Sequence, residues 1–319
     1  MSTEARTPPR VPAKGSLPGH IALVIVQVCF GLLPLFVKRM HAGGISPRGI
    51  VSWRIAAGAL VFFGLAALVH RRAMWRSRRE LMALAACAVL GVVLNQVLAL
   101  EGIVRSSSTE AGLIMTLIPV FTFALAAAVG QERFEPRRAL GIPVALAGAL
   151  LLLIEPEGAA GLASSHVFGN FLMACNCLSY AGFLILSRRV LRGMPPLVLM
   201  GWVYLFAALS LALLVPGEPL IPSGEPPVVR DAWLALGFVL AFPTLLAYGL
   251  NTYALARLPA SVTAVYIYLQ PLIAGLAGVL LLDEVPRPVL PFAAALLFAG
   301  IALVTIRRRE RSAATAKDP

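Results

Sequence analysis

Long apolar stretches separated by short polar turns fill most of the chain between residues 20 and 306. A helix needs about 20 apolar residues to cross the hydrocarbon core of a bilayer, which is about 30 Å thick. Ten stretches approach or exceed this length, and we interpret each as a membrane-spanning helix. They are residues 20–38, 49–69, 81–101, 109–130, 138–154, 167–187, 196–215, 232–256, 261–282 and 288–306. The loops between them are short, which makes consecutive spans antiparallel neighbours.

The second half of the chain repeats the pattern of the first half. Pro119 and Glu132 stand 13 residues apart, and Pro271 and Glu284 show the same spacing 152 residues later. Each copy contains five predicted spans, an odd number, so the two copies enter the membrane from opposite sides. We therefore predict an all-α integral membrane protein with ten transmembrane helices arranged as two inverted-topology five-helix repeats. This architecture is common among secondary transporters.

We divide the chain where the apolar stretches begin and end. The stretch 155–165 is rich in turn-forming and small residues, which favours a boundary between the repeats there. The predicted parts are a cytoplasmic N-terminal tail (1–19), a first repeat (20–154), a linker (155–166), a second repeat (167–306) and a basic cytoplasmic C-terminal tail (307–319).

Composition and charge agree with a membrane protein. Of all residues 59% are hydrophobic and only 13% are charged, whereas soluble domains carry about 25% charged residues. A net charge of +12 suggests nucleic-acid binding, but 20 of the 27 Lys and Arg residues fall in the two tails and in alternate loops. The positive-inside rule then places both termini in the cytoplasm. We expect a multi-pass protein of the plasma (inner) membrane, with the lipid bilayer rather than nucleic acid as its partner.

The duplicated pattern resembles the drug/metabolite transporter superfamily, in its ten-span EamA-type branch. In that branch each unit ends with a proline-centred helix, an acidic residue 13 positions further on, and a final span of small residues. Arg54, which follows Trp53 in the second span, matches an arginine often found there. The resemblance covers residues 20–306, with one departure at Ala293, where the first unit has Gly141. It implies a secondary carrier for small molecules, commonly an exporter of amino acids or other metabolites.

From pattern and resemblance together we predict a secondary active transporter. It would move a small organic metabolite, amino acid-like or related, out of the cell by alternating access, driven by a proton or other gradient. The alternatives are a facilitative carrier without ion coupling and a non-transport membrane receptor or sensor. The small residues of the fifth and tenth spans allow close packing, either within the scaffold or in a homodimer.

The sequence contains no pattern that indicates an enzyme. The four histidines lie at span ends or in loops, and no Ser-His-Asp arrangement falls within the spans. The ATP-binding pattern Gly-x-x-x-x-Gly-Lys-Ser/Thr does not occur. We expect no enzymatic activity, no cofactor and no metal site.

Two charged residues are candidates for transport chemistry. Arg54 lies inside a span, where an arginine costs about 2.5–3.5 kcal/mol on insertion scales. It is interpreted as an anion-binding or gating charge that faces the bundle interior, or as an interfacial anchor or helix-pairing residue. Glu101 ends the third span and either accepts a coupling proton or pairs with Arg105 one turn later. For Glu110, the spacing Ser107-x-x-Glu110 predicts a capping box.

Polar and aromatic residues within the spans are the candidates for the substrate path. Interhelical hydrogen bonds are the alternative role for Asn and Gln, and interfacial belts are the alternative role for Tyr. The candidates are Arg54, Asn95, Gln96, Tyr180, Asn251, Tyr253, Tyr266, Tyr268 and Gln270.

The repeated prolines and acids are given different roles. Pro119 and Pro271 are predicted to kink their helices, because proline lacks a backbone N–H, and to place the fourth and ninth spans beside the path. Glu132 and Glu284 are predicted to be structural, each linking the last two spans of its repeat, with nearby arginines such as Arg287 as partners.

Overall fold

The computed structural model describes residues 17–131, 135–153, 162–190, 194–214, 228–255 and 266–305. Within these ranges every regular element is a helix. Six helical segments are long and apolar enough to cross a membrane: Leu17–Ala42, Pro47–Val69, Arg78–Arg105, Ser108–Ala128, Ser165–Ser187 and Arg230–Asn251. Four shorter apolar segments are Ala139–Leu153, Pro196–Leu211, Leu269–Leu281 and Leu290–Val304. These segments follow the order of the ten predicted stretches, which confirms the all-helical membrane fold.

The spans of the first half are interrupted helices, apart from the fifth. They comprise α1 (Leu17–Gly31) with α2 (Leu33–Ala42); α3 (Pro47–Gly58) with η1 (Ala59–Phe63) and α4 (Gly64–Val69); α5 (Arg78–Ala88) with η3 (Val89–Val93) and α6 (Leu94–Arg105); α7 (Ser108–Ile114) with η4 (Met115–Leu117) and α8 (Ile118–Ala128); and α9 (Pro136–Leu153). A short 3-10 helix, η2 (Arg71–Met74), lies in the loop after α4.

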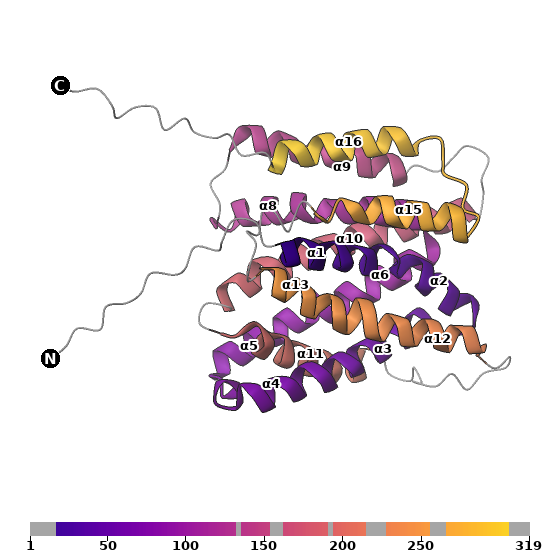
Figure 1. Cartoon of the computed structure of the whole chain (residues 1–319). Coiled ribbons are helices and arrows are strands. Elements are labelled where there is room, and N and C mark those ends of the chain that lie inside the picture. Colours follow the sequence, from indigo (N-terminus) through magenta and orange to yellow (C-terminus); the bar gives the residue numbers. More distant parts are fainter. Residues whose placement is uncertain are drawn as a thin grey trace, which may run out of the picture.

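The second half follows the same plan with fewer interruptions. Its elements are α10 (Leu162–Val190), α11 (Pro196–Leu214), α12 (Arg230–Val239) with η5 (Leu240–Leu246) and α13 (Ala247–Leu255), α15 (Leu269–Leu281) and α16 (Leu290–Thr305). We call the end of the bundle at which α1 begins and α16 ends the proximal end, on the left in Figure 1, and the opposite end the distal end.

Helices of one half pack against helices of the other half throughout the bundle. The fifth span packs on the tenth (α9 on α16) and the fourth on the ninth (α7 on α15). The third packs on the sixth (α6 on α10), and the equivalent pair by the repeat, the eighth and the first, packs in the same way (α13 on α1). The two repeats therefore share one interface rather than forming separate lobes (Figure 1).

Small residues allow the closest of these contacts, between α9 and α16. A Cβ atom added at Gly300 would lie 2.4 Å from the backbone nitrogen of Ala145, and one at Gly148 would lie 2.8 Å from the carbonyl oxygen of Ala293. These small-residue faces of α9 and α16 pack against each other within one chain. A homodimer would therefore form through a different surface from these faces.

In the described ranges, three segments have π-helical hydrogen bonding, which is rare and often found at functional sites. They are η1, η3 and η5. Shifting Val89, the first residue of η3, by 152 positions gives Ala241, which lies inside η5. The third and eighth spans thus carry the same irregularity at equivalent positions, although hydrophobic periodicity did not reveal it.

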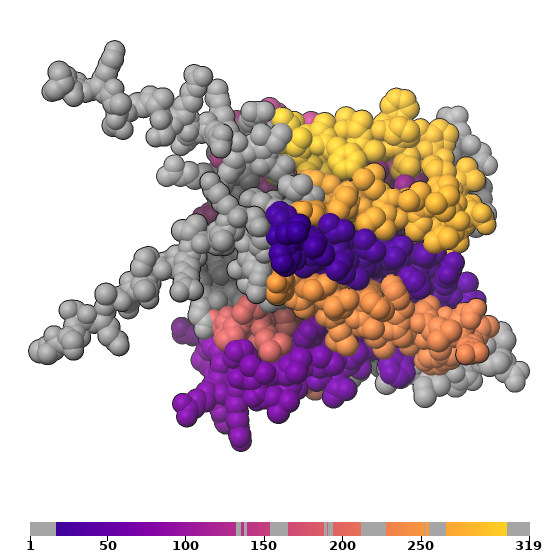
Figure 2. All heavy atoms as spheres, viewed as in Figure 1, coloured from indigo at the N-terminus to yellow at the C-terminus, as the bar shows by residue number. Residues whose placement is uncertain are grey.

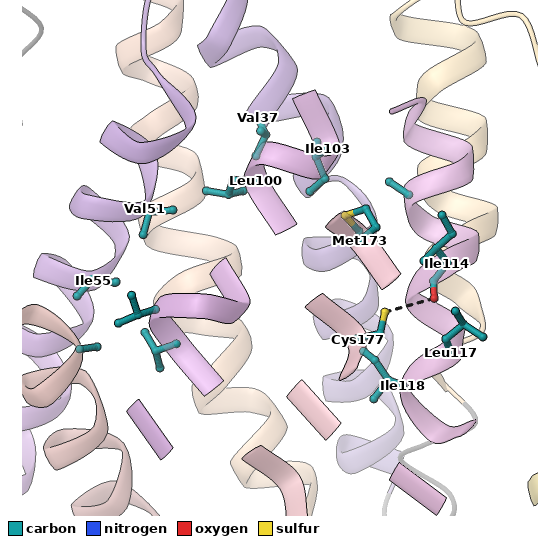
Figure 3. Close-up of a cluster of buried hydrophobic side chains, with 14 of the residues drawn as sticks. Val37, Val51, Ile55, Leu100, Ile103, Ile114, Leu117, Ile118, Met173 and Cys177 are labelled. Atoms are coloured by element: carbon teal, nitrogen blue, oxygen red, sulfur yellow. Dashed lines mark hydrogen bonds between the residues drawn. The ribbon is translucent and has the colours of Figure 1, made fainter. Parts of the chain in front are cut away.

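The core lies between the spans, and the outer faces are apolar as well. Figure 3 shows Val51 and Ile55 of α3, Leu100 of α6 and Ile114 of α7 turned toward the interior of the bundle. Cys177 of α10 joins this core, where its Sγ donates a 3.4 Å hydrogen bond to the carbonyl oxygen of Ile114 (Figure 3).

The outer surface of the bundle is apolar, as contact with lipid tails requires. The helices α1, α13 and α15 run side by side on the face shown in Figure 2. Ile21 of α1 and Leu272 and Leu276 of α15 are among their exposed apolar side chains. Such a face is stable in a bilayer and unfavourable in water.

Candidate functional site

Arg54 is buried in the interior of the second span. Its helix begins at Pro47 because the Ser46 hydroxyl accepts a 2.9 Å hydrogen bond from the amide of Gly49, a helix N-cap with proline at the first helical position. Two turns further on, the Arg54 side chain is only 4% exposed. Its Nε donates a 3.0 Å hydrogen bond to Oγ1 of Thr244 in η5.

Thr244 is positioned by the π-helical segment of the eighth span. Its hydroxyl donates a 2.8 Å hydrogen bond to the carbonyl oxygen of Val239, five residues earlier, and accepts the bond from Arg54. The irregular backbone thereby turns a small polar side chain toward the arginine of the other repeat.

Tyr204 of α11 and Gln96 of α6 bring further polar groups to the same place. Tyr204 is fully buried, and its hydroxyl lies close enough to Arg54, Gln96 and Tyr248 to interact with them. The Oη of Tyr204 and both Nε2 and Oε1 of Gln96 have no geometrically acceptable hydrogen-bond partner among the described residues. Buried polar atoms are nearly always hydrogen-bonded in native proteins, so these three atoms identify a position suited to a polar guest.

Aromatic rings surround these groups. The ring centroid of Phe62 lies 5.2 Å from that of Tyr204 and 6.1 Å from that of Tyr248, and the two tyrosine rings are 6.2 Å apart. Phe30 of α1 lies edge-on to Tyr248 at 6.1 Å. We define the central site by the residues that share this position: Arg54, Phe62, Gln96, Tyr204, Thr244 and Tyr248.

The sixth span reaches the edge of the central site. Tyr180 of α10 lies close enough to Tyr248 to interact with it electrostatically. One turn earlier, Nδ2 of Asn176 donates a 2.7 Å hydrogen bond to the backbone oxygen of Asn95, while its buried Oδ1 has no partner in the described part of the chain. Both repeats therefore contribute polar groups on several helices.

A small cavity of about 60 Å³ lies next to the central site, between spans one, three, four, six and nine. Phe30 connects the two, because it lines the cavity and contacts Tyr248. Gln270 also lines the cavity and donates a 2.7 Å hydrogen bond to Oε1 of the buried Gln27. The volume accommodates a few water molecules but is below the roughly 300–1,000 Å³ of ligand pockets.

Glu284, which lies shortly after the end of α15, connects several helices at the distal end. One of its carboxylate oxygens accepts a 2.6 Å bond from Nζ of Lys38, and the other accepts a 2.8 Å bond from the amide of Ser108 at the start of α7. The Ser108 hydroxyl adds a third, at 2.8 Å. Burial alone would raise the pKa of Glu284, but the bonds from Lys38 and Ser108 outweigh it and hold this pKa below its ordinary value. The partner that we predicted, Arg287, belongs to a different cluster.

Glu110 forms the second distal cluster, which corrects the predicted capping box. The Ser107 hydroxyl does accept a 3.0 Å bond from the Glu110 amide. The fully buried Glu110 carboxylate instead accepts a 2.6 Å bond from Nδ2 of Asn170 and pairs with Arg287 at 3.4 Å. Asn170 also accepts a hydrogen bond from the Ser106 hydroxyl. We define the distal network as Lys38, Ser106, Ser108, Glu110, Asn170, Glu284 and Arg287.

Glu101 lies at the distal end, away from the central site. Its carboxylate pairs with Arg105, one turn later on α6, and with Nε of Arg48 at 3.3 Å. Both partners come from the first repeat. The pairing with Arg105 is one of the two roles considered for Glu101 in the sequence.

The remaining path candidates are dispersed. Tyr266 bonds to Nδ1 of His20 at 2.7 Å, and the ring of Tyr268 packs on Phe298. Tyr253 is exposed, and Asn251 is half-buried on α13. The structure therefore brings Arg54, Gln96 and Tyr180 together, places Gln270 and Asn95 nearby, and separates the four residues of this paragraph from them.

Sequence reasoning missed three residues of the central site. Phe62, Tyr204 and Thr244 lie in strongly apolar spans and carry no charge. The available signals were the one tyrosine of the seventh predicted span and Thr244, one of two threonines in the eighth, each a polar group in a long apolar stretch.

The repeated prolines both stand in the first turn of a helix. Pro119 is the second residue of α8, directly after the 3-10 segment η4, and Pro271 is the third residue of α15, after a turn at Ile267 and Tyr268. The irregular backbone therefore precedes each proline. Glu132 lies outside the described residues.

Metal coordination has no candidate among the described residues, where no three His, Cys, Asp or Glu side chains are grouped suitably. Fold and central site together define a membrane protein whose two repeats enclose a buried polar position. A family model described as the EamA-like transporter family matches residues 17–154 and 167–306. The chain belongs to this family of the drug/metabolite transporter superfamily, whose members are transporters rather than enzymes.

Individual relatives are distant but cover much of the chain. The chain is 24% identical to the uncharacterized transporter YyaM of Bacillus subtilis, over 80% of its own length and 84% of that protein. It is 28% identical to the aromatic amino acid exporter YddG of Ancylobacter novellus, over 63% and 68% of the two chains. It is 26% identical to a probable terminal-alkyne amino-acid exporter of Streptantibioticus cattleyicolor, over 74% and 78%.

A solved crystal structure matches with a TM-score of 0.59 at 22% sequence identity. The match covers 90% of this chain and 96% of that one. At this identity the likeness concerns the fold alone.

Proposed function

We propose that this protein exports a small organic metabolite across the plasma (inner) membrane as a secondary transporter, with the central site as the binding position. The observation that carries the proposal is the burial of polar atoms without partners where the repeats meet. The atoms without partners among the described residues belong to Gln96 of the first repeat and Tyr204 of the second. They lie beside the hydrogen bond from Arg54 to Thr244, which also joins the two repeats. Movement of one repeat against the other would change access to such a site, as alternating access requires.

The distribution of ion pairs supports a state that is closed at the distal end. Lys38–Glu284 and Glu110–Arg287 each join one repeat to the other, and both lie at the distal end. Because the basic loops indicate that the proximal end faces the cytoplasm, the distal network would close the external side. Opening to the outside would then require these cross-repeat bonds to break.

Export is supported by two relatives whose names describe exporters, one of aromatic amino acids and one of a terminal-alkyne amino acid. These names favour an amino acid-like or related solute as the substrate, and carboxylic acids that resemble an amino acid but lack its ammonium group belong to the related solutes. A proton or other gradient would drive it, with Glu101 as the candidate for coupling. A facilitative carrier would lack this coupling, and a receptor or sensor would show no flux.

The proposal is tested by an untargeted comparison of extracellular metabolites between cells that lack the protein and cells that overproduce it. We expect at least one solute to rise outside the overproducing cells and to fall outside the deleted ones. Flux of that solute into proteoliposomes containing the purified protein then separates a carrier from a sensor. The absence of any changed solute across varied media would contradict export.

A further inference from the structure

We propose that the substrate is an organic monoanion, a carboxylate on a planar apolar or aromatic body without a compensating ammonium group. This inference rests on the proposed function and concerns the same central site. The juxtaposition that carries it combines three features in one buried position: an arginine that forms no ion pair with the described residues, two polar side chains with atoms that lack a hydrogen-bond partner among those residues, and a set of aromatic rings.

The charge of Arg54 is not neutralised within the described part of the protein. A guanidinium group has five N–H donors, and a hydrogen bond from Nε to the uncharged Thr244 hydroxyl uses one of them. No ion pair involving Arg54 forms with any described residue. The Nη groups present the planar fork that binds a carboxylate in a bidentate manner.

Acidic residues are distributed away from this position. The described acids lie at or near the ends of the spans, where Glu101, Glu110 and Glu284 are engaged in distal ion pairs. A monoanion would therefore leave the site neutral when bound. A zwitterionic amino acid would leave the net positive charge in place and would bring an ammonium group to a site that offers it no carboxylate.

The rest of the site suits a flat apolar body with a polar substituent. The ring centroids of Phe62, Tyr204 and Tyr248 lie 5.2–6.2 Å from one another, in tilted or edge-on pairs, a spacing that favours aromatic packing. The unpartnered Tyr204 hydroxyl and Gln96 amide would bind polar atoms of the guest. Removal of such atoms from water is favourable only when they gain partners.

A matched trio of compounds tests the proposal on the unmodified protein. The trio 3-phenylpropionate, L-phenylalanine and 2-phenylethylamine shares one ring and chain and differs only in charge. Indole-3-propionate, L-tryptophan and tryptamine form a second trio. Binding is measured by ligand-induced thermal stabilisation of the full chain in nanodiscs, and transport by counterflow in proteoliposomes. We expect each acid to act at concentrations at least about tenfold lower than its amino acid, with the amine weakest.

Variants then assign the preference to Arg54. Arg54→Gln is expected to abolish the preference for the acids, whereas Arg54→Lys keeps the charge and part of the preference. Arg71→Gln, at an exposed arginine, is the matched control and is expected to keep all of it. If Arg54→Gln does not fold, Thr244→Val replaces it, because loss of the hydroxyl releases the arginine and weakens the preference.

The results separate this inference from the proposed function. Equal or tighter binding of the amino acids, or no binding of any of the six compounds while another solute is exported, would overturn the monoanion class and leave export intact. Retention of the acid preference in a folded Arg54→Gln protein would also overturn it. Only the absence of flux for every solute in the metabolite comparison would count against export itself.

Discussion

Among the described residues, the buried arginine of the second span has one neutral hydroxyl as its hydrogen-bond partner, and this makes its role specific. Structural arginines in proteins are usually matched by carboxylates, because an uncompensated buried charge is costly. Arg54 bears this cost at a position where atoms of Tyr204 and Gln96 also lack hydrogen-bond partners in the part of the chain that the structure describes. Several unsatisfied groups at one position are more readily explained by a guest that satisfies them together than by separate packing defects.

Tyr204→Phe tests this interpretation at a single atom. Because the hydroxyl has no partner among described residues, its removal is expected to leave the thermal stability unchanged or to raise it by up to about 1 kcal/mol. Transport is expected to weaken by about tenfold, since the substrate loses a hydrogen bond. Flux and melting temperature are measured on the same preparation.

Tyr253→Phe provides the comparison, because Tyr253 is exposed on α13. It is expected to leave both quantities unchanged. A Tyr204→Phe protein with lower stability and normal flux would show that the hydroxyl serves packing instead.

Glu101→Gln tests gradient coupling. If Glu101 carries the coupling proton, the variant is expected to retain solute exchange but to lose accumulation driven by a pH gradient, because the amide cannot titrate. Exchange and driven uptake are compared in the same proteoliposomes. Equal gradient dependence of wild type and variant would remove Glu101 from the mechanism, and wild-type flux indifferent to the gradient would favour a facilitative carrier.

The sequence predicted the role of some residues but not the partners of others. Arg54 could be predicted because a charge in an apolar span is conspicuous. The partners of Glu284 could not, since Lys38 and Ser108 are 246 and 176 residues away. The same holds for Gln96, whose neighbours Tyr204 and Tyr248 come from the other repeat and depend on the packing of the two halves.

At the scale of elements, the π-helical segments show how the repeat shapes the site. Segments η3 and η5 occupy equivalent positions in spans three and eight, and each adjoins residues of the central site. Gln96 lies three residues after η3, while Thr244 lies within η5. Hydrophobic patterning predicted the spans and their order. It could not reveal these segments, because a π turn changes the backbone bonding without changing which residues are apolar.

Gly300→Ala tests the close contact between α9 and α16. The new Cβ would lie 2.4 Å from the backbone nitrogen of Ala145, so the helices must separate, at a cost of about 1–3 kcal/mol. The matched control is Gly237→Ala on α12, where nothing lies within 4 Å of the added atom. It is expected to be neutral or stabilising by up to about 1 kcal/mol. Equal changes in melting temperature would contradict the packing described here.

The distal network makes the stability depend on pH in a defined direction. Because the folded pKa of Glu284 lies below its ordinary value of 4.5, its contribution is complete above that value and is lost as the pH falls toward the folded pKa. The contribution of Glu284 to the melting temperature of the wild type is therefore expected to be constant from about pH 8 to about pH 5. At lower pH this contribution is expected to decrease.

Glu284→Gln is the control for this dependence. It should lower the melting temperature at neutral pH, by the equivalent of about 1–3 kcal/mol for the loss of charged hydrogen bonds. It should also reduce the fall in acid. A variant with the same acid profile as the wild type would show that other groups govern the loss of stability.

At the scale of the whole molecule, two repeats that interleave along a shared interface place the central site between them. Ion pairs join the two repeats at the distal end, while the apolar outer faces allow the bundle to lie in lipid. The duplication and the helical membrane fold were predictable from the sequence, because they depend on patterns that extend over many residues. The composition of the site depends on contacts between the halves and required the structure.

The most direct test of the account is counterflow of the exported solute in proteoliposomes that contain the purified protein. Liposomes loaded with unlabelled solute should transiently accumulate the labelled form, because a carrier exchanges bound solute across the membrane. Arg54→Gln should abolish this accumulation, and Arg71→Gln should leave it intact. No accumulation above protein-free liposomes, or equal accumulation with Arg54→Gln and wild type, would contradict a carrier that works through the central site.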